Sequence, residues 1–331
     1  MQSYMSTDQM INYLKTQKKI IVDDEDRHWL DEVNYMNLIN PYKDLFSSGK
    51  NPNGKFRYKY PVNLKEYIKV FLIESNFSHA LYIDIRNFER KFKNIIFDEI
   101  CKEYVDKYND IFCTLYIEEI EDMLNGFEAI PMFCINMYKT LTKTGYKENM
   151  YDVQKRVNLL KKIYMYGSSS KYCNDLLLKH YNNTYYVVPL WIIPNILTLG
   201  EIIMIYTMLD VNIQNNIYKR MNYNSFIKEN RIIEYRKIYN FYSKLEQIRK
   251  TRNIISHFGS LTPFIVTSIK KPKEINNSLF IQVLKLLHGN QIKFNDESFR
   301  EYCKNTDVNF ISNNNNLLIL HLLEIMEIYT K

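Results

Sequence analysis

Apolar residues recur at intervals of three and four along most of this 331-residue chain. That interval is the period of an amphipathic helix, whereas a half-buried strand alternates at every second residue. A first helix is predicted to begin at Ser6 or Thr7, whose side chains can cap the free amides of a first turn. Further helices are predicted over residues 25–38, 62–109, 111–124, 150–165, 171–181, 199–215, 225–258, 275–288 and 315–329. The pattern predicts an all-α fold.

The stretch from residue 62 to 109 has the most regular spacing. Its apolar positions are Leu64, Ile68, Phe71, Leu72, Leu81, Ile85, Phe88, Phe92 and Ile95. The gap between Leu72 and Leu81 leaves two alternatives open, which are two long helices or one helix broken near Asn76. The helix beginning near residue 199 has a clearer start, because Thr198 and Glu201 can form a capping box.

Turn-forming residues interrupt the helical pattern in "SSGKNPNGKFRYKYPVN", residues 47–63. This segment holds Gly49, Pro52, Gly54 and Pro61, and we predict a loop or a hairpin there. A domain boundary is placed at its end. The prediction is an amino-terminal helical region with a basic loop, residues 1–62, followed by one helical domain, residues 63–331.

Composition narrows the function classes. The five cysteines are widely spaced and form no C-x-x-C pair, which argues against a disulfide framework or a cysteine zinc site. We expect no metal and no cofactor, and a reducing cytoplasmic location. The most apolar stretch, residues 187–209, is interrupted by two prolines, a glycine and a glutamate, so no membrane span is predicted. The net charge of +7 permits a polyanionic partner without establishing one.

Candidate catalytic side chains gather in "KLEQIRKTRNIISHFGS", residues 244–260. The preceding apolar seam consists of Ile238, Phe241, Leu245 and Ile248. The next seam position is Arg252, which puts a guanidinium where the pattern asks for an apolar residue. Asn253 and His257 are four apart and share a helix face, with Arg249 one turn earlier. Arg252 and His257 are about 140° apart around the helix, so they flank a surface.

This grouping suits RNA cleavage. Attack of a ribose 2′-OH on the adjacent phosphate needs a base, an acid and positive charge at the phosphorane. Histidine can act as base or acid near neutrality, and arginine donates two hydrogen bonds to phosphate oxygens. One histidine cannot hold both protonation states at once, whereas two copies related by a two-fold axis can.

The residues resemble those of a known family. "RNIISH" fits the R-x4-6-H motif of the HEPN superfamily of helical ribonucleases. "STDQMINYLKTQKKIIVDDEDRHWLDEVNYMNLINPY" is similar to the amino-terminal region of Abi-like proteins of the AbiD/AbiF type. "HYNNTYYVVPLWIIPNILTLGEIIMIYTML" resembles their central P-x-W and T-x-G segment, and "DIRNFERKFKN" resembles their acidic-then-basic helix. Together these cover most of residues 5–260 and leave residues 261–331 unassigned.

The resemblance implies a bacterial abortive-infection protein with a HEPN-like helical bundle, acting on RNA and often dimeric. Some members are associated with a small non-coding RNA. Arg252 and His257 match the catalytic pair, and Asn253 matches the polar residue between them. Glu89 matches the acidic helix position. Trp191 and Gly200 match the central segment. One HEPN class carries a modified tyrosine shortly after the histidine, and "HFGSLTPF" has none.

The basic loop is a second candidate for RNA contact. Lys55, Arg57 and Lys59 alternate with aromatic residues, including Tyr58, and such a mixture binds phosphates and unstacked bases of single strands. A two-stranded ribbon would instead turn alternate residues to opposite faces and leave the rings in the core. We predict RNA-binding roles for these four residues and for Arg249.

Two functions therefore stay open. The first is a metal-independent endoribonuclease toxin that acts as a homodimer, with the helices over residues 240–258 adjacent at the two-fold axis. The second is a non-catalytic RNA-binding or dimerisation module of a defence system. His28, His79, His180, His288 and His321 are interpreted as structural.

Overall fold

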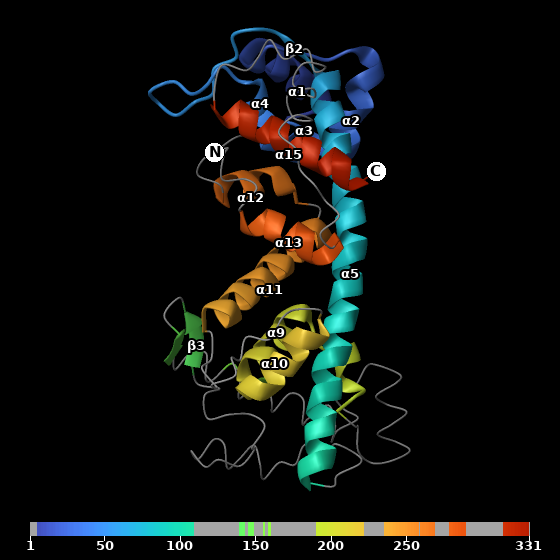
Figure 1. Ribbon diagram of the computed structural model, residues 1–331. Coiled ribbons are helices and arrows are strands. Elements are labelled where there is room, and N and C mark those ends of the chain that lie inside the picture. Colours follow the sequence, from blue (N-terminus) through green and yellow to red (C-terminus); the bar gives the residue numbers. More distant parts are fainter. Residues whose placement is uncertain are drawn as a thin grey trace. The chain divides into compact units, whose positions relative to one another are not determined.

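The computed structural model describes residues 5–108, 139–142, 145–148, 155, 158–159, 190–221, 235–257, 259–268, 278–288 and 314–330. Over these residues the protein is mostly helical, with two small two-stranded sheets (Figure 1), which confirms the all-α prediction. The helices predicted over 111–124 and 171–181 lie outside the described residues, and so does most of 150–165. In the described part of the chain, no helix is both long enough and apolar enough to span a bilayer.

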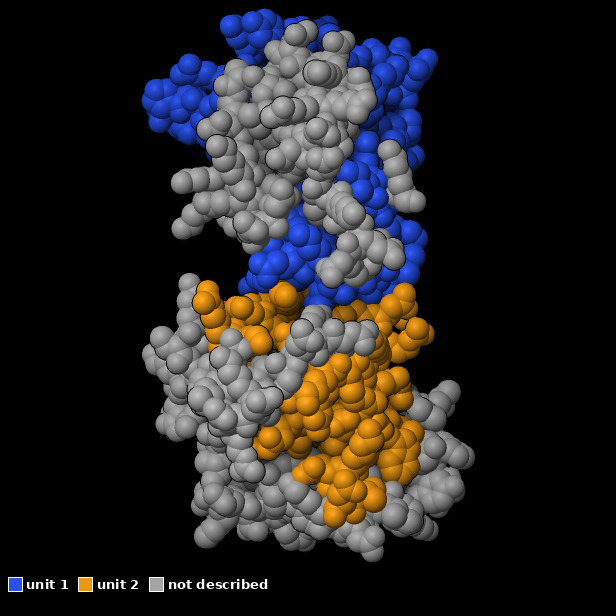
Figure 2. Space-filling view, viewed as in Figure 1, with its two compact units in different colours: residues 1–85, 250–331 blue, residues 86–249 orange. Residues whose placement is uncertain are grey.

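The chain divides into two compact units, coloured in Figure 2. The first comprises residues 1–85 and 250–331, and the second comprises residues 86–249. This division differs from the predicted boundary near residue 62. β1 (Ile20–Ile21) lies in the predicted amino-terminal region, and β2 (Val62–Asn63) lies at the predicted boundary. The two strands pair in parallel within the first unit, so hydrogen bonds connect the two predicted regions.

The first unit begins with short helices that follow the predicted positions. Ser6 accepts a hydrogen bond from the amide of Gln9, which confirms the predicted cap, and the Gln9 side chain completes a capping box that was not predicted. The elements are α1 (Thr7–Tyr13), η1 (Leu14–Lys18), η2 (Asp24–Asp26), α2 (Arg27–Glu32), α3 (Asn34–Leu38), η3 (Asn40–Tyr42) and α4 (Lys43–Phe46). The predicted helix 25–38 is thus interrupted. Asn34 takes a left-handed backbone angle, φ 63°, and its side chain caps α3.

Helix α5 (Leu64–Tyr108) is one uninterrupted helix of 45 residues. Both predicted alternatives, two long helices and one helix broken near Asn76, are therefore wrong. Asn76 is exposed, so its side chain lies in water and the buried face passes it without interruption. The buried face runs through Tyr67, Val70, Glu74, Phe77, Leu81, Ile85, Phe88 and Phe92. Leu72, which was assigned to the apolar face, is 41% exposed.

The rest of the first unit is built from the chain's C-terminal part. It contains the end of α11 (Tyr235–Ser256), α12 (Leu261–Ser268), α13 (Leu279–His288) and α15 (Asn314–Thr330). Phe77 of α5 packs edge-on against Phe280 and Tyr329, at centroid distances of 6.2 and 5.1 Å. The Tyr329 hydroxyl donates to Asp84 at 2.6 Å. Residues 261–331, which the family resemblance left unassigned, thus supply part of the core around α5.

The second unit contains α9 (Leu199–Met208), α10 (Val211–Arg220), η6 (Ile193–Asn195) and the strands β3 (Lys139–Thr142) and β4 (Gly145–Glu148). An aromatic cluster forms its core, with Phe241 of α11 edge-on to Phe92, Tyr206 and Tyr218. The capping box of Thr198 and Glu201 is confirmed. The predicted helix 199–215 is divided because Asp210 caps a new helix at the amide of Asn212.

Candidate active site on helix α11

The last two turns of α11 hold the three residues predicted to be catalytic. Arg252 and Asn253 are half-buried, and His257 is exposed. The His257 amide donates to the carbonyls of Asn253 and Ile254 at 3.1 and 3.2 Å, which keeps the histidine in the final turn. The backbone of one helix therefore fixes the relative positions of the imidazole and the guanidinium.

Arg252 continues the buried seam of α11, as the spacing predicted. Its Nε atom is buried and has no hydrogen-bond partner among the described residues. The hydroxyls of Thr251 and Ser256, on either side of it, are also buried and without a partner in that part of the chain. A buried donor without a partner costs about 1–3 kcal/mol. These orphaned groups mark the end of α11 as a place where a bound ligand would recover hydrogen bonds.

Arg249, one turn earlier, is in a different environment. Its Nε and Nη2 atoms donate to the Glu246 carboxylate at 3.2 and 2.8 Å. This hydrogen bond is the main cause that raises the pKa of Arg249. A Cβ built on Gly200 would lie only 3.2 Å from Arg249 Cδ, so the glycine makes room for the arginine stem. Arg249 therefore has an intramolecular partner, and its predicted RNA contact stays a prediction.

The backbone stays close to α11 where the helix ends. The Gly259 amide donates to the Ile254 carbonyl, five residues earlier, at 2.8 Å. A Cβ at position 259 would lie 3.0 Å from Ile254 Cγ2 and 3.1 Å from the Ile254 carbonyl oxygen. A larger residue there would therefore require Ile254 to shift by a few tenths of an ångström.

Glu74 anchors the segment that follows. Its buried carboxylate, 4% exposed, accepts from the Ser260 hydroxyl and the Leu261 amide, both at 2.5 Å. The amide and hydroxyl of Thr262 and the hydroxyl of Tyr42 also donate to it. Glu74 thus caps α12 from a distant part of the chain. The sequence analysis missed this residue, although a glutamate at a buried helical position was a usable signal.

The basic loop forms a hairpin. The amides of Ser48 and Arg57 pair with the carbonyls of Arg57 and Gly49, and Gly54 turns the chain at φ 74°. Lys55, Arg57 and Lys59 are exposed at alternate positions. Tyr58 lies on the other face, 8% exposed, with Lys18 Nζ 5.0 Å from its ring centre. Its prediction as a stacking residue is corrected, because the ribbon alternation turns this ring into the core.

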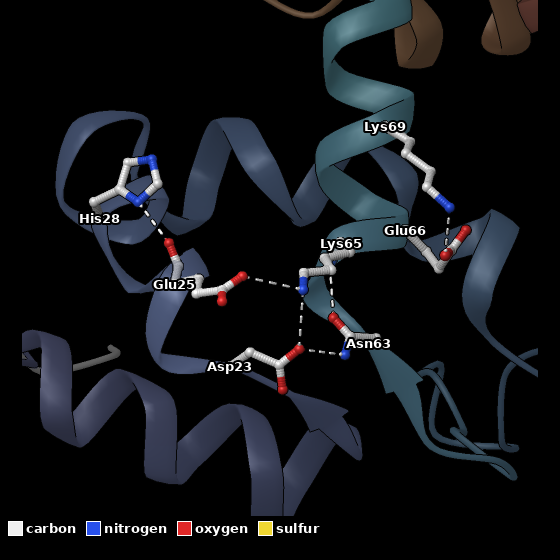
Figure 3. Close-up of polar contacts among 7 residues, drawn as sticks. All are labelled: Asp23, Glu25, His28, Asn63, Lys65, Glu66 and Lys69. Carbon is white, nitrogen blue, oxygen red and sulfur yellow. Dashed lines mark hydrogen bonds and ion pairs between the residues drawn. The ribbon is translucent and has the colours of Figure 1, made fainter.

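Figure 3 shows that Lys65, at the end of this loop, already has acidic partners. Its ammonium lies 3.5 Å from Asp23 and 3.6 Å from Glu25. Asn63 caps α5 by accepting from the Lys65 amide at 2.9 Å, and its own amide group donates to Asp23 at 3.0 Å. The nearby acidic residues, Asp26 first, raise the pKa of Lys65. Lys65 therefore supports β1, β2 and the start of α5.

The segments that carried the family resemblance meet in the second unit. Glu89 pairs with Lys93 at 2.8 Å, and both side chains are largely buried. Lys93 also donates to the Leu197 carbonyl at 2.6 Å, immediately before the capping box at Thr198. Gly200 then contacts the stem of Arg249. The acidic-then-basic helix and the central segment are thus linked by direct contacts, whereas Trp191 of that segment is 43% exposed.

Comparison with known proteins identifies the family of this chain. No curated protein and no solved structure matches the chain. The sequence profile of a family described as Abi-like protein matches residues 28–262. The matched region includes the basic ribbon, the linked segments of the second unit and the whole R-x4-H segment. Because the match covers well over half of the chain, the protein belongs to the Abi-like protein family.

Proposed function

We propose that this protein is an abortive-infection endoribonuclease of the HEPN type that cleaves RNA without a metal ion. The observation that carries the proposal is the contrast between two arginines on one helix. Arg249 is held by a carboxylate, whereas Arg252 keeps a buried Nε without a partner among the described residues, within five residues of an exposed histidine. A guanidinium and an imidazole that have no side-chain partner among the described residues, and that flank one surface, are groups that phosphate transesterification can use.

In this mechanism Arg252 binds the scissile phosphate and stabilises the charge of the phosphorane. One imidazole removes the proton from the 2′-OH, the O2′–P bond forms, and the P–O5′ bond breaks. A second imidazole donates a proton to the departing O5′. The products are a 2′,3′-cyclic phosphate and a free 5′-OH. Asn253, on the same face as His257, orients the phosphate or the imidazole through its carboxamide.

Two imidazoles in different protonation states call for two chains. The apolar seam of α11 is already covered within the chain, with Phe241, Leu245 and Ile248 at most 2% exposed. We therefore place the homodimer contact on the opposite, exposed stripe of the helix, which includes Asn240, Lys250 and His257. Two copies of Lys250 repel each other, so RNA between them should favour the dimer. Light scattering with and without RNA measures this effect.

The exposed cations of the ribbon, Lys55, Arg57 and Lys59, are proposed to bind RNA phosphates. Their alternation on one face gives a line of charge with a spacing of two residues. The bound RNA is the substrate or a cognate small non-coding RNA that controls the toxin. Replacing the three residues by glutamine should weaken RNA binding and reduce the dependence of affinity on salt.

The decisive experiment is cleavage of end-labelled RNA by the purified protein in EDTA. Products ending in 2′,3′-cyclic phosphate support the proposal, and their loss in His257→Ala assigns the activity to this protein. Binding without products would favour the alternative, a non-catalytic RNA-binding module. The exposed ribbon cations favour that alternative specifically, because they do not depend on α11. Sequencing of co-purified nucleic acid identifies the RNA in either case.

A further inference from the structure

A pocket of about 410 Å³ lies in the first unit, between one face of α5 and the C-terminal end of α11. This volume is in the range of about 300–1,000 Å³ typical of small-molecule sites. The α5 face consists of Phe71, Glu74, Ser75, Ser78, His79 and Tyr82, which recur at helical spacing. The α11 side includes Ile255 and Ser256. Neither part was predicted from the sequence as a binding site.

The residues that line the pocket suit the base of a nucleotide better than its phosphate. The Glu74 carboxylate is engaged by five donors, so it offers no further acceptor, but its charge repels a phosphate. The side chains of Ser75, Ser78 and His79 make no hydrogen bond among the described residues. They offer hydrogen-bond donors and acceptors to a polar group. The half-buried rings of Phe71 and Tyr82 add surfaces for stacking.

The pocket lies next to the candidate phosphate site. Ser256 follows Arg252 by four residues, so the two share a helix face and are about 6 Å apart along the axis. The buried Ser256 hydroxyl has no partner in the described part of the chain. A phosphate bound to Arg252 would therefore bring a base of the same or the adjoining nucleotide to the mouth of the pocket.

We propose that this pocket holds one unstacked base of the RNA next to the phosphate on Arg252, and that Ser75, Ser78 and His79 read its edge. The inference rests on the proposed ribonuclease function, because it deepens that site into one with a base preference. Recognition of single-stranded RNA commonly uses such splayed bases, stacked on rings and hydrogen-bonded at their edges. The buried Glu74 carboxylate, together with the absence of Lys and Arg from the described lining residues, disfavours binding of the phosphate itself in the pocket.

Binding of free nucleosides tests the pocket independently of cleavage. Trp29 packs edge-on against Phe71 at 6.1 Å, so its fluorescence should respond to an occupant of the pocket. Adenosine, guanosine, cytidine and uridine are titrated into the Trp191→Phe protein, which leaves Trp29 as the single tryptophan. At least one nucleoside should bind. Ser78→Phe, which fills the pocket, should weaken that binding by about tenfold or more.

Asn76→Phe adds a similar ring on the exposed side of α5 and is the matched control. It should bind nucleosides as the parent does. Circular dichroism and thermal melting check that Ser78→Phe is folded. If that variant is unfolded, His79→Ala removes an edge-reading group from an exposed position and should also weaken binding. No nucleoside binding by the folded parent, or equal binding by the parent and these variants, would overturn the inference.

Cleavage of a random-sequence RNA pool separates this inference from the proposed function. The parent should prefer one base or base class beside the cleaved bond, and Ser78→Phe should reduce that preference and raise KM more than it lowers kcat. Cleavage with an unchanged base preference in Ser78→Phe would contradict the base pocket and support the ribonuclease function. Nucleoside binding without any RNA cleavage would contradict the ribonuclease function and support a base-binding pocket.

Discussion

The two halves of α11 differ in what their side chains contact. In the half that belongs to the second unit, Ile238, Phe241, Leu245 and Ile248 are at most 2% exposed and pack into an aromatic core. In the last two turns, which belong to the first unit, residues 252–256 are all half-buried and three polar atoms lack partners among the described residues. The first half of α11 is thus well packed, whereas its last two turns are half-buried and hold polar atoms without partners among the described residues.

The difference concerns stability first, and under the proposed function it separates stability from chemistry. A buried apolar seam contributes several kcal/mol to stability, because each large side chain removes apolar surface from water. Orphaned polar atoms cost stability, and such costs collect at functional sites. Substitutions in the first half should therefore change unfolding, and substitutions in the last turns should change activity.

His257→Ala has the largest expected effect. Loss of a general acid or base lowers the cleavage rate by about 10²–10⁴-fold. The free energy of unfolding should change by at most about 0.5 kcal/mol, because the side chain is exposed. Rates on labelled RNA and thermal melting measure the two quantities, with Asn216→Ala as an exposed control on α10. Unfolding of His257→Ala, or full activity of that variant, would contradict the proposed division of α11 into a packing half and a catalytic half.

Arg252→Lys should be nearly as inactive as His257→Ala, because lysine cannot donate two parallel hydrogen bonds to a phosphate as arginine does.

Phe241→Ala tests the other half. It leaves a cavity among Phe92, Tyr206 and Tyr218, and should lower the free energy of unfolding by about 3–5 kcal/mol. Urea denaturation measures the loss. Activity per folded molecule should stay near the parent value. A fully folded variant that has lost cleavage would mean that the seam takes part in the chemistry.

Glu74→Gln tests whether the hydrogen bonds of Glu74 stabilise the segment that follows α11. The amide keeps the shape but replaces one acceptor oxygen by a donor, which leaves buried donors of Ser260, Leu261 or Thr262 unsatisfied. We expect a loss of about 1–3 kcal/mol in the free energy of unfolding. Glu66→Gln removes an exposed carboxylate of the same helix and should be close to neutral. Equal stabilities of the two variants would show that the Glu74 cluster does not anchor α12.

The smallest effect concerns pH. The hydrogen bond from Lys102, together with Arg220, lowers the pKa of Asp98 below its usual value near 3.8. A carboxylate with a lowered folded-state pKa adds stability above the unfolded pKa, and this stability is lost as the pH falls through the folded pKa. Asp98→Asn should therefore be less stable at pH 7 by at most about 1 kcal/mol, since the pair is half-exposed. The difference in melting temperature between the two proteins should shrink as the pH falls below the usual carboxyl value near 3.8. A difference that does not shrink with falling pH would contradict the ion-pair interpretation.

The helices with long apolar seams and explicit caps were predictable from the sequence. Ser6 and Thr198 cap where their patterns indicated, and the α11 seam is buried as its spacing predicted. Interactions between residues close in sequence determine these caps and this seam, so each could be predicted from a single segment. The interruption of helix 25–38 was missed, because it depends on the left-handed backbone of a single residue, Asn34.

Features that depend on distant partners were less predictable. The apolar face predicted for the start of α5 included Leu72, which is exposed in the structure. The face that is buried contains Glu74. Four of its five hydrogen-bond donors belong to residues that follow α11, and the fifth is the Tyr42 hydroxyl. The burial of Tyr58 likewise depends on which face of the ribbon meets Lys18 and the core. The roles of Arg252, Asn253 and His257 stay predictions until cleavage is measured.

The Glu74 cluster also sets the time at which the candidate site can form in a growing chain. Residues 74 and 262 are 188 positions apart, and the hydrogen bonds between them require both to be synthesised. At about 5–20 residues per second, translation of that interval takes on the order of 10–40 s. Until then the Glu74 carboxylate lacks the donors of Ser260, Leu261 and Thr262. A chain released before residue 260 therefore lacks the contacts that anchor the segment after α11.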